Sequence, residues 1–176
     1  MAVDTVMSAI EVEGMEEYLA LLDLNYKQMD RICGRSIYPG AKLISNDCKK
    51  RLINLKTDDS LFSVAAKYGR MLRGPTKRQK QGLIESMGIA SMRKRGGTFD
   101  VKLGFDGYND VPSTSSKKGT QPNALIARSV NKGTSFMHAQ PFMDQSIEAC
   151  RKPVEGKIEE QFYKELERLW DRYYSK

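Results

Sequence analysis

The side chains best suited to catalysis are one histidine and three cysteines, and their positions do not predict an active site. His138 is the only imidazole in the chain, and Cys33, Cys48 and Cys150 are 15 and 102 residues apart. A reactive thiol needs an electropositive, partly exposed setting, whereas each of these cysteines falls on an apolar helical stripe. We therefore expect reduced, buried thiols and no disulfide framework. The alternative, an enzyme built on His138 and a cysteine, predicts that thiol alkylation abolishes an activity.

Sequence patterns that bind metals or phosphates are missing as well. The chain has no CxxC pair and no group of His, Cys and carboxylate ligands at helical or loop spacing. It also lacks the phosphate loop GxxxxGK[ST], a GxGxxG fingerprint after a strand and the nucleophile elbow GxSxG. The pair Gly96-Gly97 suits a hairpin turn. The sequence therefore predicts a protein that is not an enzyme and that carries no metal or cofactor.

Charge is distributed unevenly along the chain. Lys and Arg number 29 against 22 Asp and Glu, which gives a net charge of +7. Residues 1–31 hold seven acids and two bases, whereas residues 73–102 hold eight bases and two acids. This asymmetry predicts two different faces, which could stack head to tail on copies of the chain or turn toward a polyanion. The candidate basic patch is Lys77, Arg78, Lys80, Arg93, Lys94 and Arg95.

The same basic segment supports an alternative function, a stand-alone module that binds the DNA backbone through residues 73–102. Such a module predicts a monomer or dimer whose affinity for DNA falls steeply with salt. Phe99 is the only aromatic residue between Lys77 and Lys102, and its phase assigns it to the core. Stacking on bases is therefore not expected.

The end of the chain carries a group of large aromatic residues. Trp170, Tyr173 and Tyr174 follow the last apolar stripe within five residues. Grouped aromatics are typical of partner surfaces, so these three are the candidate partner-contact surface. In the alternative, they close over the N-terminal helices of the same chain.

Apolar residues at intervals of three and four predict helices at both ends of the chain. The pattern indicates a first helix that ends at Gly34 and a second that begins at Pro39, where a proline suits the first helical turn. A shorter helix is expected over residues 60–72. The final helix, residues 143–175, carries the longest stripe, and Pro153 should kink it.

The middle of the chain predicts a capped helix followed by a hairpin. Thr76 and Gln79 have the spacing of a capping box at the start of a short helix. Apolar and polar residues alternate over residues 99–105, which predicts a half-buried strand. Its hairpin partner is expected over residues 89–92, with the connection running through residues 93–97.

A long segment rich in turn-forming residues follows the hairpin. Residues 106–121 are predicted to be a loop, and a loop of this length is usually either functional or disordered. Pro122 should begin a short helix that ends at Gly133.

These elements predict one domain, residues 1–176, of the α+β class. N-terminal helices over residues 10–72 and a long C-terminal helix over residues 143–175 should pack on one small antiparallel sheet. The sheet belongs to a region over residues 76–142 that contains the long loop 106–121. No apolar stretch is long enough to cross a membrane, so no membrane is expected among the partners.

Four segments in order resemble one protein family. They are TKRQKQGLIESMGI from Thr76, DVKLGFDGYN from Asp100, QPNALIARSVNKGTS from Gln121 and QPFMDQSI from Gln140. They include a leucine and serine at the start of a strand (Leu83 to Ser86), a glycine-threonine turn (Gly133-Thr134) and a proline-phenylalanine step (Pro141-Phe142). In this order they resemble the neck and tail-completion proteins of tailed phages, a family that includes the minor tail protein Z of phage lambda. The resemblance covers roughly residues 10–165.

The resemblance implies a structural role in the virion. Members of this family form rings, usually homohexamers, at the top of the tail, where it meets the capsid connector. Such a ring completes the tail and joins it to the filled head, and DNA passes through its lumen. The implied partners are other copies of the chain, a tail terminator or tail tube protein and the head-tail connector or stopper proteins, with transient, non-specific contact with genomic DNA. The implied location is the neck of the virion, assembled in the host cytoplasm.

Overall fold

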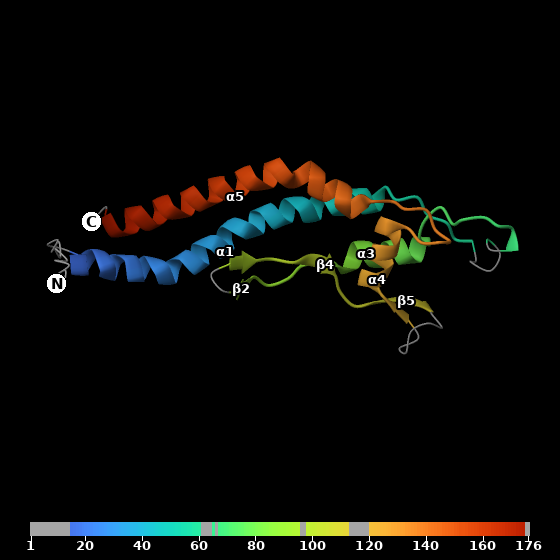
Figure 1. Ribbon diagram of the computed structural model, residues 1–176, viewed down its shortest axis with the longest axis horizontal. Helices are drawn as coiled ribbons and strands as arrows, with labels where there is room; N and C mark the ends of the chain where they lie inside the picture. Colours follow the sequence, from blue (N-terminus) through green and yellow to red (C-terminus); the bar gives the residue numbers. More distant parts are fainter. Residues whose placement is uncertain (1–14, 61–64, 66, 96–97, 113–119, 175–176) are drawn as a thin grey trace, which may run out of the picture.

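The computed structural model describes residues 15–60, 65, 67–95, 98–112 and 120–174. Two long helices, α1 (Met15–Ile53) and α5 (Phe142–Tyr174), lie side by side and antiparallel as a stalk (Figure 1). A head lies at the other end from the two termini and holds α3 (Lys77–Ser86), α4 (Asn123–Lys132) and short strands. The predicted α+β class is confirmed, but the strands form three separate antiparallel pairs in place of the one small sheet that we expected.

The N-terminal stalk is one helix, so the prediction of two helices separated by Gly34 and Pro39 was wrong. Helix α1 continues through both residues. A Cβ atom at Gly34 would lie 2.9 Å from Met92 Cε in the hairpin, and one at Gly40 would lie 2.8 Å from Ile158 Cγ1 on α5. The glycines therefore allow neighbouring elements to approach closely, and this packing keeps the helix continuous although Pro39 removes one backbone donor.

Helix α3 begins as the sequence predicted. The Gln79 amide donates to Thr76 Oγ1 at 3.1 Å, and the Thr76 amide donates to Gln79 Oε1 at 3.0 Å, so the reciprocal capping box is present. Leu83 and Met87 are buried. The cap fixes the point at which the chain turns from the preceding segment into the head.

The predicted hairpin is present but interrupted. Strand β1 (Met87–Ile89) pairs with β4 (Leu103–Phe105), and β2 (Arg93–Arg95) pairs with β3 (Thr98–Asp100), both antiparallel. The backbone amide of Ala90 donates to the Lys102 carbonyl at 2.8 Å between the two ladders. The assignment of residues 93–95 to the connection was wrong, because these residues extend the hairpin as its outer strand.

The segment predicted as the loop 106–121 is structured at both ends. Strand β5 (Tyr108–Pro112) pairs with β6 (Thr120–Pro122) in an antiparallel ladder with an irregular register. The side chain of Asn123 donates to the Asp106 carbonyl at 2.8 Å, which ties the two ends together. The prediction of a loop was therefore wrong for these ends, while residues 113–119 lie outside the described part of the chain.

The remaining predicted elements lie around this ladder. Helix α4 begins after Pro122 and ends before Gly133 as expected, and the positive φ of Gly133, 74°, favours glycine at this position. Helix α5 runs through Pro153 without ending. Of the helix expected over residues 60–72, residues 61–64 and 66 lie outside the described part of the chain. Residues 65 and 67 are helical, but the prediction was wrong for residues 68–72, which form a turn and an extended segment in which Leu72 forms a bridge with Met137.

The apolar core lies in the head. It is formed by residues from the end of α1, from α3 with β1, from α4 and from the start of α5, namely Cys48, Leu52, Leu55, Leu83, Met87, Ile126, Ala127, Val130, Met137 and Phe142. Leu52, Leu83 and Val130 are 0% exposed. The stalk contributes Cys48 and Leu52 from the head end of α1 and Phe142 from the start of α5, and its part nearer the chain termini contributes no residue to this cluster.

Candidate functional site

The six residues of the predicted basic patch lie in two different places. Lys77, Arg78 and Lys80 belong to α3 in the head, whereas residues 93–95 form β2, farther along the long axis beside α1 (Figure 1). The structure therefore does not bring the six together as one surface.

Three of these lysines stabilise the fold. Lys80 Nζ donates to the carbonyls of Ile53 at 2.6 Å and Leu55 at 3.1 Å, so it satisfies acceptors at the end of α1. Lys77 pairs with Asp59 through its backbone amide and its ammonium group. A fold-stabilising contact of this kind competes with any binding of phosphate.

Lys94 is engaged in the same way on the hairpin. Its ammonium group lies 2.7 and 2.9 Å from the two carboxylate oxygens of Asp30 on α1 and 5.4 Å from the centre of the Phe99 ring. Arg93 and Arg95 are exposed in the same strand. The hairpin thus attaches to α1 through Lys94 and presents two guanidinium groups to solvent.

The candidate residues for catalysis and for partner contact contribute little to a described site. Cys48 is buried as expected, but Cys33 and Cys150 are only half-buried. Burial raises the pKa of all three thiols above the ordinary value, the opposite of what a nucleophile requires. His138 is exposed and uses its backbone amide to bond the Leu72 carbonyl at 3.0 Å. Within the described ranges no group of three metal-ligating side chains exists.

Two further predictions concern the C-terminal helix and membranes. Trp170, Tyr173 and Tyr174 occupy the last turns of α5, and their side chains lie outside the described residues. Among the helices in the described part of the chain, none has the length and apolar character needed to span a bilayer.

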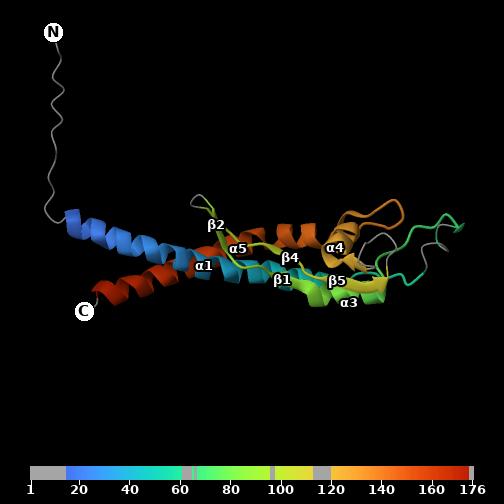
Figure 2. The same ribbon diagram turned by 90° about the horizontal axis from the view of Figure 1, so that it is seen from below.

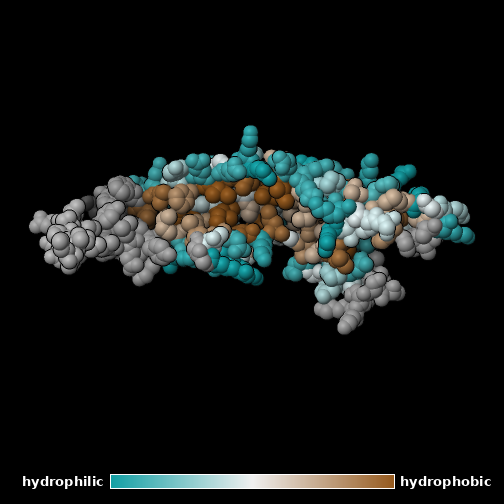
Figure 3. Space-filling view, in the orientation of Figure 1, coloured by the Kyte–Doolittle hydropathy of each residue, from teal (hydrophilic) through white to brown (hydrophobic). Residues whose placement is uncertain are grey.

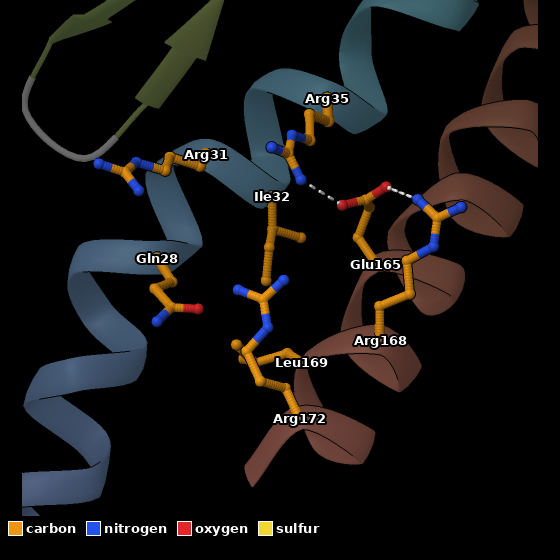
Figure 4. Close-up of a pocket in the computed structure, with 8 residues that line it drawn as sticks. All are labelled: Gln28, Arg31, Ile32, Arg35, Glu165, Arg168, Leu169 and Arg172. Carbon is orange, nitrogen blue, oxygen red and sulfur yellow. Dashed lines mark hydrogen bonds and ion pairs between the residues drawn. The ribbon is translucent and has the colours of Figure 1, made fainter.

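A pocket of about 370 Å³ opens between the stalk helices. Figure 2 shows α1 and α5 crossing and then diverging toward the chain termini. The residues around the pocket come from both helices, and four of the eight are arginines. They are Gln28, Arg31, Ile32, Arg35, Glu165, Arg168, Leu169 and Arg172 (Figure 4). Because residues four apart share one face of a helix, each helix contributes a pair of arginines.

Glu165 is the single carboxylate of this arginine pocket. It is 5% exposed, and it accepts hydrogen bonds from Arg35 Nη1 at 3.0 Å and from Arg168 Nη1 at 2.8 Å. The hydrogen bond from Arg35 holds the pKa of Glu165 below its usual range, the charge of Arg168 lowers it further, and burial opposes both. The Arg35–Glu165 pair therefore joins the two helices across 130 residues of sequence.

The other two arginines have no such partner. Neither Arg31 nor Arg172 makes a side-chain hydrogen bond or ion pair with another residue in the described part of the chain. Figure 4 shows the guanidinium group of Arg172 extending into the space between the helices, whereas Arg31 points away from α5. Four positive charges against one negative charge make the pocket attractive to oxyanions, which arginine binds with two parallel hydrogen bonds.

The sequence showed the arginine spacing but not the pocket. The pairs at positions 31 and 35 and at positions 168 and 172 are both visible as i,i+4 repeats. Only the antiparallel packing of α1 on α5 brings the two pairs to one gap, and no local pattern reports that contact.

We expect the Glu165 contact to make the stalk sensitive to acid. A carboxylate whose pKa is lower in the folded than in the unfolded state stabilises the fold at pH values above its ordinary pKa of 4.5. That contribution is lost as the pH falls through the pKa of the folded state. Glu165→Gln should therefore reduce the free energy of unfolding most at neutral pH. Its difference from the wild type should shrink below pH 4.5 in urea denaturation curves.

Glu167→Gln is the matched control for this measurement. Glu167 is exposed on the same helix, so the variant removes the same charge without breaking the link between the helices. Equal pH profiles for the two variants would contradict the assignment.

Comparisons with known proteins do not identify the chain: no family model, no curated protein and no solved structure gives a significant match.

Proposed function

We propose that the protein is a structural subunit of the neck of a tailed phage, where copies form a ring, with a homohexamer as the expected form. In this role it completes the tail and joins it to the head connector, and the lumen of the ring passes the genome. Its partners are then its own copies, a tail terminator or tail tube protein and the connector or stopper proteins. Arg93 and Arg95 face either the lumen or the neighbouring ring, where they make transient, non-specific contacts with DNA.

The observation that carries this proposal is the open stalk. Along α5 the apolar stripe is only half-buried, although it lies beside α1. The half-buried residues are Val154, Ile158, Phe162, Leu166 and Leu169. In the orientation of Figure 1, hydrophobic residues gather along the middle of the stalk (Figure 3). Two helices cover each other on one side alone, so a third layer from another molecule would complete this packing.

The residues that carry the family resemblance support the same proposal by their structural roles. Phe142 of the Pro141-Phe142 step is buried at the start of α5, and Gly133-Thr134 forms a turn in which the Thr134 amide donates to the Met137 carbonyl at 3.0 Å. Leu83 is buried just before the chain enters β1. These positions organise the head, as expected of a scaffold.

The proposal is tested by measuring the mass of the purified protein by light scattering, alone and with tail tubes added. We expect a ring-sized assembly, free or on the end of the tube. Phe162→Asp should reduce the assembly to monomers because it introduces a charge into the half-buried stripe. Lys164→Asp, at an exposed position two residues away on the same helix, should leave it intact.

Circular dichroism would verify that both variants keep their helices. A wild-type monomer that ignores tail tubes and binds duplex DNA with a steep salt dependence would contradict the neck role. That result would favour the stand-alone module that binds DNA through residues 73–102.

A further inference from the structure

We propose that the arginine pocket binds carboxylates from the acidic start of α1 in a second copy of this chain. This inference rests on the proposed function, because the second copy is the neighbouring subunit of the ring. It adds a named contact to that proposal: Arg172, with Arg31 at the rim, receives Glu16 and Glu17 of the neighbour.

The pocket already holds one carboxylate and has the charge to accept another. Arg35 and Arg168 both donate hydrogen bonds to Glu165. Guanidinium groups from both helices can therefore bind a carboxylate in this pocket. Arg172 extends into the same gap without an ion pair among the described residues (Figure 4). A second carboxylate would bring the charge of the site from +3 toward neutrality and would replace water on a guanidinium fork that is suited to it.

The complementary acidic segment is the beginning of α1. Residues 15–26 contain three acids and no base, and Glu16 and Glu17 are the second and third residues of the helix. Acidic residues are favourable in the first turn, where they face the positive end of the helix dipole. The segment therefore brings negative charge to the termini end of the stalk.

The geometry of α1 prevents this segment from binding in its own pocket. The helix is continuous from Met15 to Ile53, and at 1.5 Å per residue Glu16 and Glu17 lie about 17–22 Å along its axis from Gln28 and Arg31. A rigid helix cannot fold back over that distance. If Glu16 and Glu17 reach the pocket, they therefore belong to another molecule, which makes the contact heterologous and able to propagate around a ring.

The experiment is a charge-reversal cycle on the full chain, with self-association measured by sedimentation velocity at low and at moderate salt. Arg172→Glu alone, and Glu16→Arg with Glu17→Arg, should each weaken association at least tenfold. The triple variant should recover to within about threefold of the wild type. Lys152→Glu makes the same charge change at an exposed position on α5 and should have little effect.

The outcomes separate this contact from the ring itself. A wild-type ring that Arg172→Glu leaves intact, or a triple variant that is not rescued, overturns the contact but leaves the neck role standing. A wild type that never self-associates, even on tail tubes, overturns both. Loss of duplex DNA binding in Arg172→Glu with unchanged self-association would assign the pocket to phosphate and also overturns the contact.

Discussion

Replacing Phe142 by alanine is expected to lower the free energy of unfolding by about 3–5 kcal/mol, the range for truncating a buried phenylalanine. Phe142 is 2% exposed, and its ring meets that of Phe105 edge to face with centroids 6.1 Å apart. The substitution would leave a cavity where the start of α5 joins the core of the head. Urea denaturation followed by circular dichroism measures the loss.

Phe136→Ala is the matched control for this prediction. Phe136 is 42% exposed, so removing its ring opens no cavity in the core, and we expect a loss of less than about 1 kcal/mol. Similar losses for the two variants would show that the Pro141-Phe142 step does not anchor α5 to the head.

Gly40→Leu is expected to separate the two stalk helices and to cost about 1–3 kcal/mol, the usual effect of overpacking. Even a Cβ atom at this position would lie 2.8 Å from Ile158 Cγ1 and 3.1 Å from Val154 Cγ1. Both neighbours are β-branched and have little rotamer freedom in a helix, so the backbones must move apart. The loss is measured in the same denaturation assay.

Gly156→Leu tests whether the effect belongs to the contact or to the residue type. A Cβ atom at Gly156 meets nothing within 4 Å. Leucine has a higher helix propensity than glycine, so this variant should gain up to about 1 kcal/mol. If Gly40→Leu also stabilised the protein, the close approach of α1 and α5 would be refuted.

Local signals in the sequence predicted the parts of the fold that depend on neighbouring residues. The capping box at Thr76 and Gln79, the alternation in the hairpin that contains β1 and β4, and the end of α4 at Gly133 each depend on a few residues of adjacent chain. The interactions that stabilise these features are made within a short stretch of chain, so the features can be predicted without a tertiary structure.

Other predictions were wrong because glycine, proline and turn-forming residues were taken to end helices or to form loops. Gly34 and Pro39 were expected to divide α1, but the helix continues because its neighbours pack against it on both sides. Residues 108–112 and 120–122 were expected to lie in a loop, yet they pair with each other across the intervening segment. In each case packing or pairing with a distant segment outweighs a local preference of about 1–3 kcal/mol.

By itself the sequence determined the α+β class, the helical ends of the chain and the uneven charge, because composition and periodicity report directly on burial and secondary structure. Tertiary structure alone decided where the charges meet. It dispersed the predicted basic patch by binding Lys80 to the end of α1 and Lys94 to Asp30, and it assembled the arginine pocket from two helices. Contacts between segments 130 residues apart depend on how helices pack, and no spacing within either helix encodes its partner.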